Sequence, residues 1–204
     1  MYLLGIDDAT RSGWGLLDAP HGADPSIVAS GALKLTMKES HARQVYRLLR
    51  GLPARPEHVA VEMPVPYYEG DGNKRHIRNW QGVLTQAWIM GLWADAVFEV
   101  FGFRVEYVAP SKWQSALLKG AFGESTKSRS FNFCLRKWGY RPADDNEADA
   151  LCIAFWLHTR YGFVPRFDPT DKNAGTKRAL ANHIARHGGD PMMLQLLEEK
   201  ERRK

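Results

Sequence analysis

Short apolar runs alternate with turn-forming residues over the first part of the chain. Residues 2–6 and 13–17 are mostly apolar, and residues 27–35 alternate between apolar and polar positions. Runs of this length and period are typical of strands, and strands joined by short turns usually pair with one another in order. The pattern therefore predicts three consecutive antiparallel strands.

The middle of the chain is predicted to contain a helix, a strand and a second, longer helix. Apolar residues at helical spacing indicate a helix over residues 39–52, which Pro53 ends. Residues 58–62 include the run VAVE, typical of a buried central strand that ends in a carboxylate. Residues 79–101 carry apolar side chains on more than one side, so this helix should be buried on two faces. Its second face fits burial within the domain as well as contact with a second subunit, by close approach at Gly82, Gly91 and Ala94.

The rest of the chain divides into further core elements and a tail. A strand is predicted at residues 103–108. Three helices are predicted after it, at residues 110–118, at residues 126–138 and from near Asp144 onward. Together the elements predict one α/β domain over residues 1–162, with a five-stranded mixed sheet (three antiparallel strands, then parallel strands) flanked by helices. Residues 163–204 change in character and are predicted to form a linker and a charged helical tail.

Composition narrows the class of protein. The chain has 204 residues and a net charge of +5 at pH 7, which is enough length for one core and a mild basic excess that suits a polyanionic partner. Cys134 and Cys152 fall in apolar helical patterns without metal-ligand spacing, so we expect buried, reduced thiols. The N-terminus shows no charged leader or cleavage signal, and no apolar run reaches membrane-spanning length. We therefore expect a cytoplasmic protein with no membrane partner.

Three carboxylates stand where predicted core elements end or begin. Asp7 follows YLLGI, Glu62 follows VAV, and Asp149 lies in DDNEADA. Burying such groups is costly unless they are paired or bind a cation, and their hard oxygens favour Mg²⁺, or Mn²⁺, over softer metals. In phosphodiester hydrolysis two ions about 4 Å apart would activate the attacking water and stabilise the leaving oxygen, with Asp7 between them. Taken singly, the three residues also fit a turn, a strand-end ion pair and a solvated helix face.

Four segments resemble successive motifs of a known family. LLGIDDATRSGWGLLD, VAVEMP, VAPSKWQSALLKG with TKSRS, and DDNEADALCIAFW follow one another over residues 2–158 as the motifs of RuvC-type Holliday-junction resolvases do. The resemblance implies an RNase H-like fold and a metal-dependent endonuclease that resolves four-way junctions or other branched DNA by symmetric nicks. It also implies two metal ions per site and a homodimer, whose symmetry matches that of the junction.

The resemblance also assigns residues. It places metal ligands at Asp7, which is followed by a turn with Gly13 and Gly15, and at Glu62 and Asp149, and it places Lys127 at the scissile phosphate. The family usually has Asp or His three residues before the last Asp, where this chain has Asn146. Asn146 is one candidate for the fourth ligand, as a weaker one, and Asp145 is the other. Both lie on the same face of a helix as Asp149.

The segment MPVPYYEGDGNKRHIRNW after Glu62 is the candidate for contact with opened DNA. In the family an aromatic three residues after the Glu enters the junction, whereas here that position is Val65 and the aromatics come later. Stacking on unpaired bases together with phosphate contacts would favour branched DNA, although a plain exposed loop also fits. The candidate DNA-binding residues are Tyr67, Tyr68, Lys74, Arg75, Arg78, Lys112, Lys127 and Arg129.

Other functions share parts of this pattern. Actin-like ATPases use a similar first motif but need two such domains, for which this chain is too short. An RNase H acting on RNA–DNA hybrids would use the same carboxylates but would have less need of a two-faced helix. A non-catalytic protein that binds branched DNA, with one metal lost through Asn146, is the alternative from another class.

Overall fold

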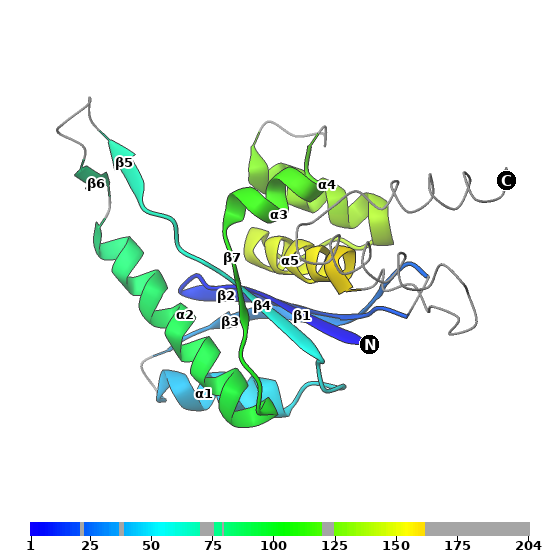
Figure 1. Ribbon diagram of the computed structural model, residues 1–204, viewed down its shortest axis with the longest axis horizontal. Coiled ribbons are helices and arrows are strands. Elements are labelled where there is room, and N and C mark those ends of the chain that lie inside the picture. The colour runs from blue at the N-terminus through cyan, green and yellow to red at the C-terminus, as the bar shows by residue number, and fades with distance from the viewer. Residues whose placement is uncertain (21–22, 37–38, 70–75, 79, 120–124, 162–204) are drawn as a thin grey trace, which may run out of the picture.

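A five-stranded mixed sheet forms the centre of the computed structural model, which describes residues 1–20, 23–36, 39–69, 76–78, 80–119 and 125–161 (Figure 1). The strand order is β3-β2-β1-β4-β7. The first three strands pair antiparallel, and β1 with β4 and β4 with β7 pair parallel. The strands of the sheet are β1 (Tyr2–Asp7), β2 (Arg11–Asp18), β3 (Ser26–Lys34), β4 (His58–Glu62) and β7 (Glu106–Val108).

Helices cover both faces of the sheet, as Figure 1 shows. On one face lie α1 (His41–Arg50) and α2 (Trp80–Phe101), and on the other lie α3 (Pro110–Leu117), α4 (Thr126–Trp138) and α5 (Asp145–Tyr161). Strand alternation separates the core accordingly: Leu3 packs in the cluster with α5, whereas Leu4 and Ile6 pack in the cluster with α1 and α2. The mixed α/β architecture predicted from the sequence is therefore confirmed.

Glycines let α5 lie directly on the first two strands. A Cβ at Gly5 would lie 2.1 Å from the carbonyl oxygen of Ala150, and a Cβ at Gly13 would lie 1.9 Å from that of Asn146. Any larger residue at these positions would push the helix away from the sheet. Gly13 therefore belongs to β2, opposite Asp7, and not to the turn before it. The close packing brings the first turns of α5 to the end of β1.

Two local predictions differ from the structure. The segment after Glu62, expected as a loop, contains a two-stranded antiparallel hairpin of β5 (Tyr67–Glu69) and β6 (His76–Arg78). Its tyrosines and isoleucine favour extended backbone. The predicted strand over residues 103–108 is shorter, since only Glu106–Val108 pair with β4, while the ring of Phe103 stacks on that of Phe101 with centroids 6.0 Å apart.

The remaining predictions about the chain as a whole have different outcomes. Both cysteines are buried free thiols, as expected. Within the described residues, no helix has the length and apolar character needed to cross a membrane. Residues 162–204, which include the predicted linker and tail, lie outside the described part of the chain, so that domain boundary stays a prediction.

Candidate metal centre

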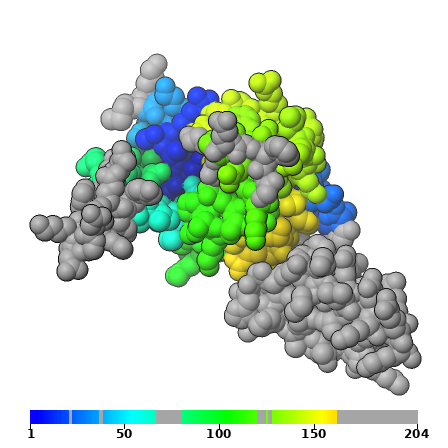
Figure 2. Space-filling model, turned by 90° about the horizontal axis from the view of Figure 1, so that it is seen from above, coloured from blue at the N-terminus to red at the C-terminus, as the bar shows by residue number. Residues whose placement is uncertain are grey.

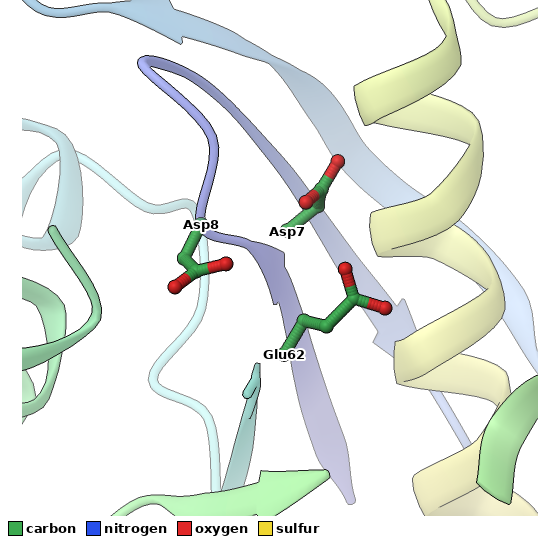
Figure 3. Close-up of side chains that lie close together, drawn as sticks. All are labelled: Asp7, Asp8 and Glu62. Carbon is green, nitrogen blue, oxygen red and sulfur yellow. The ribbon is translucent and has the colours of Figure 1, made fainter. Parts of the chain in front are cut away.

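Asp7 and Glu62 meet because they end adjacent parallel strands. Ile6 pairs with Val61, so the carboxyl ends of β1 and β4 reach the same edge of the sheet. Asp8 follows β1 directly, and one carboxylate oxygen from each of the three acids lies within 4.8 Å of the others. Figure 3 shows Asp7 and Glu62 on the side of β1 that faces the yellow helix α5, and Asp8 on the opposite side. The sequence predicted the first two residues and missed Asp8.

Asp149 reaches the same place from α5. Its negative charge raises the pKa values of both Asp7 and Glu62, and the charge of Asp145 also acts on Asp7. The close packing of α5 on β1 and β2 at Gly5 and Gly13 places the first turns of this helix beside the end of β1. The three carboxylates that the sequence singled out thus converge, with Asp8 in addition.

The electrostatics of the cluster favour a bound cation. Burial, followed by the charge of Glu62, holds the pKa of Asp7 well above its usual range. Burial and the same charge raise the pKa of Asp8 to about 8, although its own backbone N–H acts in the opposite direction. Burial raises the pKa of Glu62 to about 7, and a hydrogen bond from Trp113 opposes this rise. Crowded carboxylates of this kind ionise together only with a counter-charge, and their oxygens suit a hard divalent ion.

Trp113 on α3 is a site residue that sequence reasoning missed. Its side chain is fully buried, and its indole Nε1 donates a hydrogen bond of 2.7 Å to Oε1 of Glu62. A buried indole N–H generally needs an acceptor, so the presence of a tryptophan predicts that some partner exists. Its identity depends on how α3 packs over β4, which the local sequence does not encode. The bond fixes the orientation of the Glu62 carboxylate.

The start of α5 is tied to the second strand. Nδ2 of Asn146 donates to the backbone oxygen of Arg11 at 2.7 Å, and Nε of Arg11 pairs with Asp144 at 2.6 Å. The Asn146 amide nitrogen is thus engaged in holding the helix in place. The choice between Asn146 and Asp145 as the fourth ligand stays a prediction.

Glu147, in the first turn of α5, is also a buried acid, but unlike Asp8 it is surrounded by hydrogen-bond donors. Its Oε1 accepts hydrogen bonds from the Ser30 hydroxyl at 2.6 Å and the Tyr140 hydroxyl at 2.7 Å. Its Oε2 accepts one from the backbone N–H of Ala143 at 2.6 Å. The network links α5 to β3 and to the segment before the helix, so Glu147 holds the helix that presents Asp149.

The predicted DNA-binding residues lie on other elements. Lys127 is in the first turn of α4, which Ser125 caps, and Lys112 is exposed on α3, while Arg129 is half-buried on α4. Figure 2 shows atoms of the first strands (blue) at the surface beside those of α3 (green) and α4 (yellow-green). For Tyr67, Tyr68 and Arg78 in the hairpin, only the backbone is described. Lys74 and Arg75 lie outside the described residues.

The sheet order, the helices on both faces and the acidic edge define an RNase H-like domain. Among solved structures, the chain is similar to Thermus thermophilus RuvC in complex with a Holliday junction substrate. That match has a TM-score of 0.59 and 25% identity and covers 76% of this chain and 90% of the other. A second structure of Thermus thermophilus RuvC matches with a TM-score of 0.54 and 24% identity over 76% of this chain and 91% of the other. No protein-family model and no curated protein matches. The resemblance to RuvC-type resolvases is confirmed at the level of the fold.

Proposed function

We propose that this protein is a metal-dependent endonuclease that resolves Holliday junctions or other branched DNA. The observation that carries the proposal is the convergence of Asp7, Glu62 and Asp149 at one edge of an RNase H-like sheet. A RuvC with this fold was solved with a Holliday junction substrate, which supports the choice of substrate.

The site would use Mg²⁺ or Mn²⁺, with two ions held by Asp7, Glu62, Asp149 and either Asn146 or Asp145. When bound, the ions supply an activated water and neutralise the charge that develops on the leaving oxygen. The protein provides the orientation: Trp113 fixes Glu62, and the glycine contacts hold α5 and its Asp149 against β1. Lys127 would contact the scissile phosphate. The products would carry a 5′ phosphate and a 3′ hydroxyl.

Branched DNA would be recognised by the hairpin and the two helices beside the site. Tyr67 and Tyr68 on β5 would stack on unpaired bases, because aromatic stacking selects opened over paired DNA. The cationic candidates would contact phosphates, in keeping with the net charge of +5. They are Lys74, Arg75, Arg78, Lys112 and Arg129.

A homodimer would place two such sites on the two strands of a junction. One side of α2 packs on the sheet, while Trp80, Leu84 and Trp88, spaced by four residues, lie together on its surface. Trp80 and Trp88 are each 54% exposed, and such aromatic side chains are typical of subunit interfaces. The exposed side of α2 therefore supports dimer formation, and the symmetry of a four-way junction gives it a function.

The test is cleavage of a synthetic four-way DNA junction beside a linear duplex and an RNA–DNA hybrid. Wild type and Asp7→Asn are compared with and without Mg²⁺ or Mn²⁺. We expect paired symmetric nicks on the junction alone, only with metal, and lost in the variant. Cutting of the hybrid would replace the proposal by an RNase H activity. Tight junction binding without any metal-dependent cut would replace it by a non-catalytic binding function.

A further inference from the structure

Asp8 is the most deeply buried acid of the cluster, with 1% of its surface exposed. Neither of its oxygens accepts a hydrogen bond from another residue that the structure describes. Figure 3 shows one of these oxygens on the side of Glu62 and the other turned away from it. An ionised carboxylate in this state has lost its hydration without compensation from the described residues, which is unfavourable.

The described protein supplies no positive charge to Asp8. None of the ion pairs found among the described residues includes it. Arg11, which lies three residues further along the chain, pairs with Asp144 at 2.6 Å instead. The neighbouring charge that acts on Asp8 is that of Glu62, which is negative. Among the described residues, therefore, no side chain provides a counter-charge for Asp8, and a cation from solution could provide one.

The spacing of the oxygens fits a single ion. One oxygen each from Asp7, Asp8 and Glu62 lies within 4.8 Å of the other two. Oxygens on opposite sides of a Mg²⁺ ion are about 4.2 Å apart, and those around Ca²⁺ are spaced more widely. Small rotations of the three side chains would bring all three oxygens into contact with one divalent cation.

We propose that Asp8 is a metal ligand, and that Asp7, Asp8 and Glu62 together hold one divalent cation at the end of β1. This deepens the proposed function and rests on it. With Asp149, the site then contains four carboxylates, whose combined charge balances that of two divalent ions. With Asn146 as the further ligand, which would add an oxygen but no charge, Asp8 would complete this charge balance.

The experiment measures Mn²⁺ binding to the full chain without DNA, by electron paramagnetic resonance of free Mn²⁺ during titration. Wild type is compared with Asp8→Asn, Asp8→Ala and the control Asp24→Asn. Asp24 is a highly exposed acid paired with Lys137, so its variant removes the same charge away from the cluster. We expect both Asp8 variants to lose one ion from the stoichiometry, or to bind it at least tenfold more weakly, and Asp24→Asn to match wild type.

Thermal unfolding gives a second readout and a check on folding. In EDTA the Asp8→Asn protein should melt at or above the wild-type temperature, while the rise that Mn²⁺ causes should be smaller than in wild type. Binding by both Asp8 variants with wild-type stoichiometry and affinity would overturn the role of Asp8 and leave the proposed function standing. Absence of Mn²⁺ binding to wild type would overturn the proposed function itself.

Discussion

Glu147 and Asp8 are both buried acids beside the candidate metal centre, but their surroundings differ. Glu147, 2% exposed, accepts hydrogen bonds from two hydroxyls and a backbone N–H. Asp8, 1% exposed, accepts none from another described residue and faces the negative charge of Glu62. The described residues thus compensate the burial of Glu147 but not that of Asp8.

The difference separates two uses of a buried carboxylate. Donors arranged around Glu147 make it a fixed link between α5 and β3, with its charge already stabilised. The acids at the end of β1 and β4 keep oxygens available and repel one another, which is unfavourable for folding but favourable for cation binding. Burial alone would not distinguish the two; the number of donors does.

The largest expected effect is on catalysis, from the acids of the candidate metal centre. Glu62→Gln and Asp149→Asn should each lower the rate of junction cleavage by about 100- to 1000-fold, because the ions they would hold stabilise the transition state by several kcal/mol. Junction binding and the melting temperature should stay near wild type. Single-turnover cleavage, gel-shift binding and thermal unfolding measure the three quantities. A variant that keeps its activity would remove that residue from the metal site.

The next largest effect is on stability, from the substitution of Glu147. Glu147→Ala leaves the donors of Ser30, Tyr140 and Ala143 without an acceptor and should reduce the free energy of unfolding by about 3 kcal/mol. Urea denaturation in EDTA measures it. Asp8→Ala serves as the matched variant, since it also removes a buried carboxylate. An equal loss of stability in both variants would mean that the hydrogen bonds to Glu147 do not stabilise it more than Asp8 is stabilised.

The pH dependence of stability sharpens the same contrast. In EDTA, the unfolding free energy should fall as the pH rises, because raised pKa values mean that the folded state holds protons more tightly than the unfolded chain. The decline should begin near the ordinary pKa values of 3.8 for Asp8 and 4.5 for Glu62 and end above about 8. One pKa unit corresponds to about 1.4 kcal/mol, so the total should exceed that figure.

Added Mn²⁺ and the Asp8→Asn variant provide the controls for this pH effect. Saturating Mn²⁺ should flatten the decline above neutral pH, since the bound ion stabilises the ionised carboxylates. Asp8→Asn should flatten part of it in EDTA. Stability that rises with pH in EDTA would contradict the raised pKa values of the cluster.

The sheet and half of the centre were predictable because they depend on local pattern. Short apolar runs, with alternation over residues 27–35, predicted the strands, and the end of a parallel strand places Asp7 and Glu62 at one edge whatever else surrounds them. Asp149 was predicted from its place at the start of a core helix, and the resemblance of its motif supports the same residue. These inferences need only the period of the chain and the rule that parallel strands share an edge.

The missed residues depend on contacts between distant segments. Consecutive residues of a strand point to opposite sides, so the position of Asp7 says nothing about whether the side of Asp8 is solvated or buried. The acceptor for Trp113 is 51 residues away in the sequence. The donors to Glu147 come from β3 and from the segment before α5, so the sequence of the helix alone does not show them.

The smallest effect concerns the indole donor that Trp113 supplies to Glu62. Trp113→Phe removes the indole N–H from Glu62 while keeping an aromatic ring in the core. The Glu62 carboxylate should then be less well oriented and more easily protonated, since the bond lowers its pKa. We expect the metal concentration for half-maximal cleavage to rise three- to tenfold, about 1 kcal/mol, with little change in the rate at saturating metal.

Trp138→Phe is the matched control for this last prediction. It removes an indole N–H that donates to the backbone oxygen of Pro25 at 2.8 Å, in a part of the molecule away from the acids. Both variants should lose stability, because each loses one hydrogen bond and part of a ring, and Trp113→Phe should lose more because its ring is fully buried. Only Trp113→Phe should shift the metal dependence. Equal metal dependence in the two would mean that the bond to Glu62 serves packing alone, and that Glu62 binds metal without help from a donor.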